Sequence, residues 1–576
     1  MWHYANPPLP SFYTVTKIPS SDAARRRAGF AKGRQTDAEA LRQVDALLAD
    51  MPLRRDLLLE YLHRIQDAHG CLPKAQLVAL AARLGLAPVE VFEVASFYHH
   101  FEVLEDEDAN RPQALTVRVC DSLSCAMAGA DTLAAALEAQ ATSNVRIVRV
   151  PCVGRCDRAP AVVVGDCPIA PATADTVAAA VASAQHAPET LCAIGFDDYV
   201  AAGGYACLKR CHDDPLFRAQ ALDRVEQADL RGLGGAGFPA ARKWRIVREQ
   251  PAPRLMVVNL DEGEPGTFKD RVVLESDPHR MLEGMLIAAL MAGCDAVYIY
   301  LRDEYPAIRA LLIRELAALQ TRLTLPLPTI ELRRGAGAYV CGEESALIES
   351  LEGKRGMPRL RPPFVAERGL FGRPTLVNNG ETLFWVRELA EGGAAAFRAA
   401  GENGRHGLRR FSVSGRVARP GVVLAPAGIT LNRLIDEYCG GMAAGHVLQG
   451  YFPGGASGGI LPARLADVPL DFDTLAEHGC FIGSAAIIVF STQDDVRALA
   501  LNAMRFFAHE SCGKCTPCRV GTHKAAELMA QPVWDAALLG ELAATMRDAS
   551  ICGLGQAAPN PMECALRYFP EAFADV

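Results

Sequence analysis

The spacing of apolar residues changes repeatedly along this chain, and each change predicts a new folding unit. Residues 36–108 carry apolar side chains at three- and four-residue steps, the period of an amphipathic helix, so we expect a small helical bundle there. Residues 1–35 show no such period, and the basic patch at Arg25–Arg27 has no apolar run behind it. That segment is therefore predicted to be an extended arm rather than a signal peptide.

Residues 109–187 combine apolar runs of strand length with helical segments. Their order, strand–helix–strand–strand–helix, predicts a small α/β domain. Residues 188–215 are less regular and are expected to form a linker. Between 216 and 407, the short apolar runs LMVVNL and AVYIYL flank the helical segment HRMLEGMLIAALMAG, which predicts a second and larger α/β domain.

The last third of the chain separates into a β-rich part and a helical part. Residues 408–495 contain the short strands RRFSVSGRV, GVVLAPAG and AAIIVFS, together with a helical stretch that begins LNRLIDEY. Residues 496–576 follow the helical period again. The pattern as a whole predicts a multidomain α/β protein.

Composition and charge narrow the function. The net charge of -8 lacks the basic surplus of nucleic-acid-binding proteins. The most apolar stretch, Met285–Cys294, is too short to cross a bilayer, so we expect a cytoplasmic protein without a membrane span. Cysteines are numerous, and in a reducing cytoplasm they indicate metal ligation rather than a disulfide scaffold. Those outside ligand-like spacings are expected to be small core residues.

The first cysteine set consists of Cys120 and Cys125, followed by Cys152 and Cys156. Both pairs come just after predicted strands, with C-x4-C and C-x3-C spacing. Four thiolates that converge from two loops are typical of a [2Fe–2S] cluster. Gly154 in the second loop permits a close backbone approach. Zinc prefers C-x2-C pairs, but the spacing alone leaves a zinc site or unrelated core cysteines open.

The second cysteine set is denser. The segment SCGKCTPC supplies Cys512, Cys515 and Cys518 at C-x2-C-x2-C spacing, which is typical of a [4Fe–4S] cluster. The fourth ligand must come from elsewhere, and Cys552, which lies in SICGLGQ at a predicted helix end, is the preferred candidate. Cys564 in the helix-like segment ECALRYF is the alternative, and zinc is the less favoured alternative metal.

A glycine-rich loop follows the expected linker region. The segment RGLGGAGFPAARKW contains G-x-G-x-x-G as Gly232, Gly234 and Gly237. An ordinary dinucleotide fingerprint follows a strand, whereas polar sequence precedes this one, so an ordinary Rossmann site is not expected. The loop still lets a planar ring or a phosphate approach closely, and Lys243 is placed to pair with a phosphate. Two clusters without a nucleophile pattern indicate electron transfer, and a flavin is needed to link them to two-electron chemistry.

Further polar loops complete a candidate nucleotide pocket. Asn259, Asp261 and Glu264 follow the strand LMVVNL, at the end where α/β folds bind ligands, although a solvated acidic turn is the alternative. The segment RRGAGAYVCGEESALIESLEGKRG is a second glycine-rich loop that runs into a helix and offers its N–H groups to an anion. With RPPF at 361–364 and VNNGET at 377–382, these segments predict one large pocket.

These motifs together carry a family resemblance. The segments GLGGAGFP, DEGEPGTFKDR, GAYVCGEESALIESLEGKRG, PPF, VNN and ESCGKCTPCR resemble the flavin-bearing NADH-oxidising subunit of respiratory complex I. The N-terminal third, with its four cysteines, resembles the small thioredoxin-like subunit of the same enzyme. The fusion of the two is most similar to the β, or diaphorase, subunit of soluble NAD-dependent molybdenum or tungsten formate dehydrogenases. The resemblance covers the chain from about residue 36 to its end.

The resemblance implies a fold for each part of the chain. It implies a helical bundle at 36–108, a thioredoxin-like [2Fe–2S] domain at 109–187 and, after the linker, a Rossmann-like domain for FMN and NAD at 216–407. A ubiquitin-like β-grasp domain would span 408–495, and a helical [4Fe–4S] domain would span 496–576.

The resemblance also implies roles for single residues. FMN would contact Gly232, Gly234, Gly235, Lys243, Asn259, Asp261, Tyr339, Gly342, Glu343, Asn378 and Asn379. NAD would be held by Phe238, Glu264, Glu344 and Phe364, and Gly237 and Arg361 complete the cofactor-binding set. No side chain is expected to act as an acid or base, because Glu264 and Glu344 only position NAD.

Three positions depart from the family pattern. Arg361 stands where lysine is common, which keeps the positive charge with another geometry. Ile246 stands where some relatives carry an aromatic residue, so one adenine contact is weakened. Gly380 stands where valine or isoleucine is usual, so the packing after the paired asparagines is expected to differ.

The implied function is that of an NAD(H)–FMN diaphorase subunit. It would reduce NAD+ with electrons delivered through its iron–sulfur clusters from a formate-oxidising α subunit. That partner would hold a molybdenum or tungsten pterin and further clusters, in a heterodimer or larger hetero-oligomer. The alternatives are the diaphorase subunit of an NAD-reducing hydrogenase, a fused complex I NADH module and, in another class, a non-catalytic iron–sulfur scaffold. The intact cluster cysteines favour the formate enzyme over the hydrogenase, and intact Lys243 and Glu264 count against the scaffold.

Overall fold

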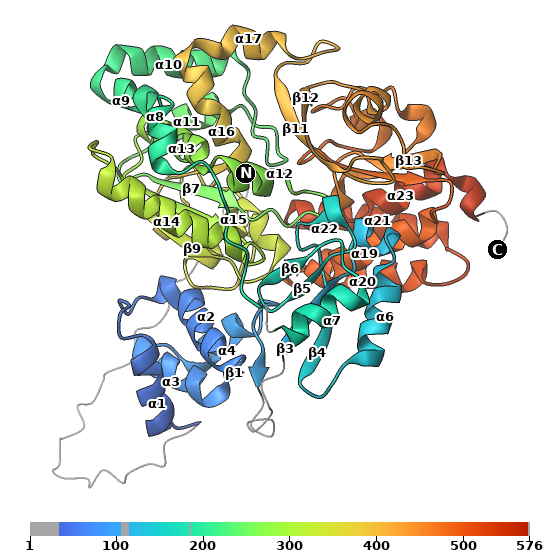
Figure 1. The fold of residues 1–576 in the computed structure, drawn as a ribbon, viewed down its shortest axis with the longest axis horizontal. Helices are drawn as coiled ribbons and strands as arrows, with labels where there is room; N and C mark the ends of the chain where they lie inside the picture. Colours follow the sequence, from blue (N-terminus) through green and yellow to red (C-terminus); the bar gives the residue numbers. More distant parts are fainter. Residues whose placement is uncertain (1–33, 105–114, 184–185, 574–576) are drawn as a thin grey trace, which may run out of the picture.

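The structure is a computed structural model that describes residues 34–104, 115–183 and 186–573 (Figure 1). Almost all of the predicted N-terminal arm, up to residue 33, lies outside the described residues. One continuous apolar core joins the helical domain, the large α/β domain, the β-rich domain and the C-terminal helices. The small α/β domain has a core of its own, with Val117, Val119, Val162 and Val164 at its centre.

The N-terminal domain is the helical bundle that the apolar period predicts. Asp37 caps the first helix by accepting a hydrogen bond from the Ala40 N–H at 2.8 Å, and left-handed Gly70 and Gly85 end the second and third helices. A short parallel pair of strands closes the domain. The elements are α1 (Ala38–Leu47), α2 (Leu58–His69), β1 (Leu72–Pro73), α3 (Lys74–Leu84), α4 (Pro88–Ala95) and β2 (Val103–Leu104).

The next domain has a thioredoxin-like arrangement, as expected. Its sheet has the order β4-β3-β5-β6, in which β3 pairs parallel with β4 and antiparallel with β5. The parallel pair requires the crossover helix that the sequence predicts between the two strands. The elements are β3 (Leu115–Cys120), α5 (Leu123–Met127), α6 (Ala130–Gln140), β4 (Val145–Val150), β5 (Val162–Val164), β6 (Cys167–Ile169) and α7 (Ala174–Ala182).

The prediction of a linker at residues 188–215 is wrong. This segment contains two helices, α8 (Phe196–Ala201) and α9 (Ala206–Asp213). The hydroxyl of Tyr199 donates a hydrogen bond to buried Glu283 at 2.7 Å, and the hydroxyl of Tyr205 lies 2.7 Å from Nδ1 of His279. Because the two helices are short and partly anchored by polar groups, the apolar period that identifies longer helices is absent here.

The large α/β domain is built on a parallel sheet of order β10-β7-β8-β9. Its central strands are buried along nearly their whole length, since helices cover both faces. A helix, α10, precedes the glycine-rich loop, which confirms that the loop is not an ordinary Rossmann turn. The elements are α10 (Pro215–Gln227), α11 (Ala240–Arg248), β7 (Leu255–Leu260), α12 (Lys269–Ser276), α13 (Pro278–Ala292), β8 (Ala296–Leu301), α14 (Pro306–Arg322), β9 (Thr329–Arg334), α15 (Glu344–Leu351), β10 (Thr375–Asn379), α16 (Gly380–Glu388) and α17 (Ala394–Ala399).

The β-rich domain has the ubiquitin-like β-grasp order. Its sheet runs β12-β11-β15-β13-β14, with the first and last long strands, β11 and β15, parallel at the centre. Residues 431–438 are helical, as the sequence predicts. The elements are β11 (Leu408–Gly415), β12 (Gly421–Pro426), α18 (Leu431–Arg433), β13 (Leu448–Phe452), β14 (Leu461–Pro462) and β15 (Ala486–Ser491).

The C-terminal domain is helical. Figure 1 shows its red helices beside the orange β-grasp domain. No helix within the described ranges is both long and apolar enough to cross a membrane. The elements are α19 (Val496–Glu510), α20 (Thr516–Met529), α21 (Ala536–Ala549), α22 (Gly553–Ala557) and α23 (Asn560–Tyr568).

Candidate functional site

The structure brings the first four predicted ligand cysteines together. Cys120 ends β3, Cys125 lies in α5, and Cys152 and Cys156 belong to the loop after β4. All four are buried, the sulfur atoms of Cys152 and Cys156 lie 3.2 Å apart, and the Cys120 thiol contacts those of Cys125 and Cys152. Neighbouring thiols and Arg302 hold the pKa of Cys152 well below its usual range. A donor set of four converging sulfurs fits a [2Fe–2S] cluster.

The loop with the second pair packs on the large α/β domain. The guanidinium of Arg302, just after β8, donates a hydrogen bond to the carbonyl oxygen of Cys152 at 2.7 Å. Gly154 has a φ of 73°, and a Cβ atom there would lie 2.3 Å from the hydroxyl of Tyr305. The close approach that the sequence predicts for Gly154 is therefore an approach to a neighbouring domain as well as to the cysteines.

The second set also converges. Cys512, Cys515, Cys518 and Cys552 line one small cavity between α19, α20 and α22. Cys564 does not line it, because its sulfur atom lies 3.6 Å from that of Cys480 on another side of the domain. Burial raises the pKa of the Cys518 thiol to about 11 and that of Cys552 to about 12, so cluster binding must displace their protons.

A cavity of about 1110 Å³ lies at the carboxyl ends of β7 and β10. These strands are parallel neighbours, so Asn259 and Asn379 lie opposite each other at the same edge of the sheet. The glycine-rich loop and the start of α15 form other walls. Twelve of the predicted cofactor residues line this cavity: Gly232, Gly234, Phe238, Lys243, Asn259, Gly342, Glu343, Glu344, Arg361, Phe364, Asn378 and Asn379.

Charged and amide side chains fix the walls of the large cavity. The ammonium of Lys243 lies 3.2 Å from the carboxylate of Glu344, and Arg361 lies at the same distance from that carboxylate. The Asn259 amide donates to the carbonyl of Gly342 at 2.8 Å. These contacts join four segments of the chain, around residues 243, 259, 342–344 and 361.

The glycine-rich loop can follow its path only without side chains at two positions. A Cβ atom on Gly234 would lie 2.8 Å from Cβ of Asn379. Gly237 has a φ of 64°, and a Cβ atom there would lie 2.7 Å from the ring of Phe472. Gly232 is less constrained, because a Cβ atom there would lie 3.5 Å from the nearest atom.

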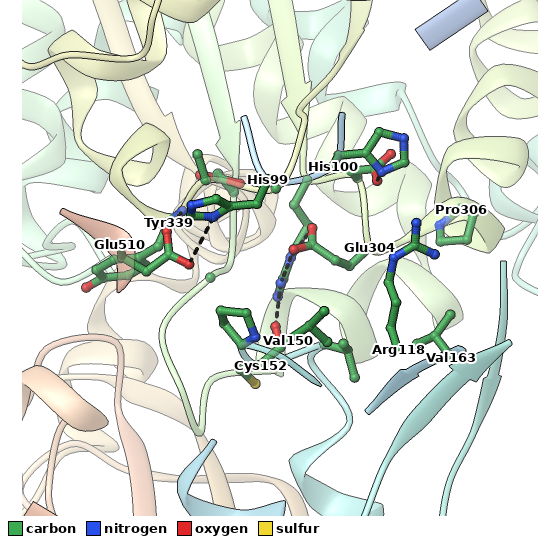
Figure 2. A pocket seen from close by; sticks show the side chains of 18 of the residues that line it. His99, His100, Arg118, Val150, Cys152, Val163, Glu304, Pro306, Tyr339 and Glu510 are labelled. Carbon is green, nitrogen blue, oxygen red and sulfur yellow. Dashed lines mark hydrogen bonds and ion pairs between the residues drawn. The ribbon is translucent and has the colours of Figure 1, made fainter. Parts of the chain in front are cut away.

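Three predicted residues lie outside the large cavity. Asp261 and Tyr339 line a separate cavity of about 100 Å³ that also borders Cys152 and Glu510 (Figure 2). Glu264 accepts hydrogen bonds from the Tyr339 hydroxyl and, at 2.7 Å, from the Ser457 N–H. Burial raises the pKa of Glu264 to about 7 and that of Asp261 well above its usual range. Asp261 Oδ2 is buried without a hydrogen-bond partner among the described residues.

Two further predicted residues, Gly235 and Gly237, line neither cavity. Gly235 approaches Gly483 of the β-grasp domain instead, with a φ of 125°. The glycine-rich loop therefore has some residues that line the large cavity and others that approach the β-grasp domain, a difference that the sequence did not reveal.

The large cavity includes residues that sequence reasoning missed. Ser550 and Ile551 line it next to the predicted residue Cys552, so a candidate ligand of the second cluster borders the same cavity as the paired asparagines. Other missed lining residues are Arg242, Arg359, Glu367, Asp548 and Gln556. Arg242 adjoins Lys243, and Gln556 lies in the segment around Cys552. Proximity in the sequence to a predicted residue could therefore have identified both as candidates.

The structure shows the surroundings of two residues that depart from the family pattern, Gly380 and Ile246. A Cβ atom on Gly380 would lie 2.6 Å from Leu260 Cδ2, so the position is filled by a neighbouring side chain rather than by its own. Ile246 lines the large cavity.

Three family models match successive parts of the chain. The thioredoxin-like [2Fe–2S] ferredoxin model matches residues 44–185, the Nuo51 FMN-binding domain matches 225–388, and the iron–sulfur binding region of NADH-ubiquinone oxidoreductase-F matches 498–576. The F 2 subunit of NADH-quinone oxidoreductase in Rhizobium meliloti (strain 1021) is 37% identical over 390 residues, which are 65% of this chain and 92% of the relative. The chain belongs to the family of NADH-quinone oxidoreductase F subunits.

Other similar proteins support this family assignment. The mitochondrial NADH dehydrogenase [ubiquinone] flavoprotein 1 of Dictyostelium discoideum is 39% identical over 377 residues, 62% of this chain and 78% of the relative. A crystal structure of an NAD+-reducing [NiFe]-hydrogenase in the H2-reduced state has a TM-score of 0.79 and 34% identity, and the match covers 91% of this chain and 93% of that chain. This member of the family is thus an NADH-dehydrogenase flavoprotein that also carries the thioredoxin-like domain.

The family's cofactors fit the residues that are present. The chain binds FMN, NAD, a [2Fe–2S] cluster and a [4Fe–4S] cluster. Two groups of four converging cysteines offer the kind of sulfur donors that such clusters take. The large cavity exceeds the usual size of a small-ligand site, and Gly234 on its wall has no room for a side chain beside Asn379.

Proposed function

We propose that this chain is the NAD(H)–FMN diaphorase subunit of an NAD-dependent formate dehydrogenase. In this function it reduces NAD+ with electrons that reach it through iron–sulfur clusters from a formate-oxidising partner. The observation that carries the diaphorase function is the shared cavity, because Lys243, the paired asparagines and Cys552 all border it. A bound flavin and the second cluster would then be neighbours.

The chain's own residues bind and position the cofactors. Lys243 and Arg361 supply positive charge for phosphate groups, and Gly342, Glu343 and Glu344 at the start of α15 line the same cavity. Asn259, Asn378 and Asn379 supply amide donors and acceptors at the strand ends. Phe238 and Phe364 are exposed rings at the cavity wall, where a planar base can stack. Glu344 is assigned to positioning NAD.

The remaining predicted residues act from the other side of this cavity. Asp261 and Tyr339 line the smaller cavity beside Cys152, and Glu264 accepts a hydrogen bond from the Tyr339 hydroxyl. We assign these three residues to the wall of the flavin site on the side of the smaller cavity. Gly235 and Gly237 are assigned to the turn that holds the glycine-rich loop against the β-grasp domain. A bound flavin exchanges two electrons with a nicotinamide and passes them on singly.

The identity of the partner subunit distinguishes two candidate enzymes, a formate dehydrogenase and an NAD-reducing hydrogenase. The four buried, converging cysteines of the thioredoxin-like domain support the formate enzyme, in which that cluster is retained. A second candidate, the diaphorase subunit of an NAD-reducing hydrogenase, is supported by the likeness of almost the whole chain to such a hydrogenase structure. In either case the proposal is a cytoplasmic hetero-oligomer, and for the formate enzyme the partner carries a molybdenum or tungsten pterin.

Purification of the native complex with a metal analysis of the partner tests this proposal. Molybdenum or tungsten with formate-dependent NAD+ reduction is expected, whereas nickel with hydrogen-dependent reduction would identify the hydrogenase. A dye assay on the isolated chain separates both from a non-catalytic scaffold. NADH should reduce ferricyanide when FMN is bound, and bound FMN without this activity would support the scaffold.

A further inference from the structure

Three side chains from distant parts of the sequence meet at the rim of the smaller cavity. His99 follows α4 of the helical domain, whereas His509 and Glu510 form the last turn of α19 in the C-terminal domain. Each offers one ligand atom, and these atoms all lie within 4.8 Å of one another. Figure 2 shows His99 and Glu510 facing each other beside Tyr339. We propose that His99, His509 and Glu510 bind a divalent transition-metal ion of the zinc type.

The gap between the side chains has the size that an ion would fill. Nδ1 of His99 and Oε1 of Glu510 are 3.9 Å apart, too far for a hydrogen bond. Ligand atoms bound to zinc at about 2.0–2.2 Å in a tetrahedral site are separated by roughly 3.3 Å, so the three side chains would close on the ion and a water molecule would be the fourth ligand. The other carboxylate oxygen of Glu510 accepts the Tyr339 N–H at 2.9 Å, which holds the carboxylate in place.

The two imidazoles lie close enough to each other to share one ion. The rings of His99 and His509 face each other with centroids 4.1 Å apart. A neutral imidazole has a free lone pair for a metal. Two imidazoles and one carboxylate favour zinc and its neighbours over magnesium or calcium, which prefer oxygen ligands.

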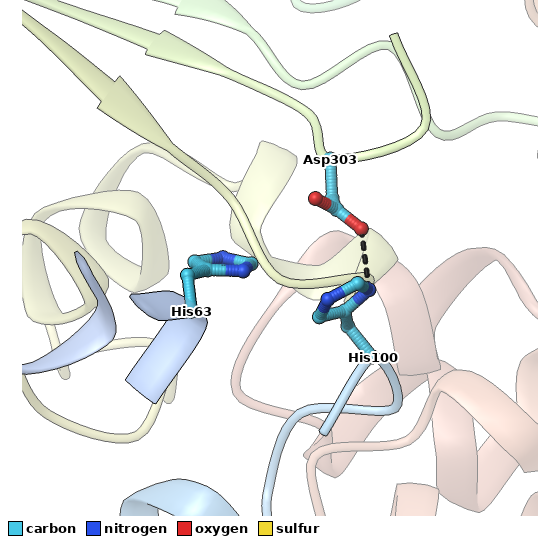
Figure 3. A group of neighbouring side chains, drawn as sticks. All are labelled: His63, His100 and Asp303. Carbon is cyan, nitrogen blue, oxygen red and sulfur yellow. Dashed lines mark ion pairs between the residues drawn. The ribbon is translucent and has the colours of Figure 1, made fainter. Parts of the chain in front are cut away.

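A second group of two histidines and a carboxylate is less suited to bind a metal ion. His63, His100 and Asp303 also lie close together (Figure 3). There Asp303 accepts a hydrogen bond from His100 Nδ1 at 2.6 Å and another from the Arg334 guanidinium at 2.5 Å. The guanidinium neutralises this carboxylate and would repel a dication. In contrast, no lysine or arginine within the described ranges forms an ion pair with Glu510, which only the more distant charge of Arg302 reaches.

The ion would join two domains next to a cluster loop. His99 belongs to the segment that leads out of the helical domain, and Glu510 lies two residues before Cys512. Metal binding would therefore fix the helical domain against the C-terminal domain. It would also hold the backbone of Tyr339, through its bond to Glu510, at the wall of the smaller cavity. This role does not depend on the identity of the partner enzyme.

Zinc binding to the full chain, with its clusters in place, tests the proposal. Equilibrium dialysis followed by metal analysis should find one zinc ion per chain that excess magnesium does not displace, with the iron content unchanged. His99→Ala and His509→Ala should each weaken zinc binding more than about 10-fold. His523→Ala, which changes an exposed histidine on α20, should leave it unchanged.

Two results would overturn the proposal. One is equal zinc affinity in the wild-type chain, His99→Ala and His509→Ala. The other is a similar loss in His523→Ala, which would indicate non-specific binding to surface histidines. Anomalous diffraction at the zinc edge from zinc-soaked crystals gives an independent readout. The expected peak lies between the three side chains, and a peak only at other positions would contradict the site.

Discussion

The ammonium of Lys243 lies 3.2 Å from the carboxylate of Glu344, although 101 positions separate the two residues in the chain. Lys243 comes from the helix after the glycine-rich loop, and Glu344 begins α15. Their contact closes one wall of the large cavity and joins two loops that both carry predicted cofactor residues. The pair therefore offers a direct test of how this cavity binds a phosphorylated ligand.

Lys243→Ala should weaken FMN binding. A charged hydrogen bond contributes about 1.5–3 kcal/mol, so the loss of the ammonium should lower FMN affinity roughly 10- to 100-fold. FMN released from the purified variant by acid, and measured by fluorescence, checks this. Lys524→Ala changes an exposed lysine that forms an ion pair with the nearby Glu527, and it serves as the control. Full FMN content in Lys243→Ala would contradict the phosphate role.

Gly234→Ala should also reduce bound FMN, for a steric reason. The added methyl group would lie 2.8 Å from Cβ of Asn379, so either the glycine-rich loop or the start of α16 must move. Gly540→Ala on α21 is the matched control, because a Cβ atom there meets nothing within 4 Å. That control should keep its FMN and gain a little thermal stability, since alanine is the better helix former. Equal FMN content in both variants would show that the loop does not contact the flavin.

Cys552→Ser should lose the [4Fe–4S] electron paramagnetic resonance signal, whereas Cys564→Ser should keep it. Cys552 lines the same small cavity as Cys512, Cys515 and Cys518, but Cys564 lies against Cys480. The signal of the [2Fe–2S] cluster serves as the internal control, because its cysteines lie in another domain. Loss of the [4Fe–4S] signal in Cys564→Ser with retention in Cys552→Ser would reverse the ligand assignment.

Phe364→Ala should raise the KM for NADH while kcat changes little. Phe364 is 54% exposed at the wall of the large cavity, where a bound ligand can cover its ring. Loss of that stacking surface should raise KM by about 10-fold, because it removes apolar contact made equally before and during the reaction. Ferricyanide reduction at varied NADH gives both constants. Phe92→Ala, in the helical domain, is the control, and an unchanged KM in Phe364→Ala would remove this residue from the nucleotide site.

Glu510→Gln should remove a pH-dependent loss of stability. Burial raises the pKa of the Glu510 carboxyl to about 8 from its ordinary value of 4.5. The unfolded chain therefore ionises this group at lower pH than the folded chain does. The wild-type protein thus loses stability as the pH rises from about 4.5 to about 8, and the loss is complete above that value.

Melting temperatures of the wild type and of Glu510→Gln, measured from about pH 5 to about pH 9, check this prediction. A chelator in the buffer removes loosely bound metal ions. Glutamine can still accept the Tyr339 N–H bond that Glu510 accepts at 2.9 Å. The variant should melt at increasingly higher temperature than the wild type as the pH rises, and the difference should level off near pH 8. Parallel melting curves would show that the carboxyl is not buried in the way described.

Local patterns in the sequence determined much of this protein. The helical period, the apolar strand runs and the parallel order of β7 and β8 around α13 follow from residues close together in the chain. The C-x2-C-x2-C segment places three sulfurs near one another by its spacing alone, and the glycine positions identify loops that can approach a ligand. For these features the physical information lies within a few residues.

Tertiary packing decided the rest. Spacing does not determine whether Cys552 or Cys564 faces the other three cysteines, because that depends on how α22 and α23 pack. It also does not show that residues 188–215 fold against the large domain through the buried acid Glu283. Asp261 and Tyr339 face a different cavity from Asn259, although Asp261 is only two residues away, because the chain turns at the end of β7. The meeting of His99 with Glu510 depends on contact between two domains, and no local pattern encodes such a contact.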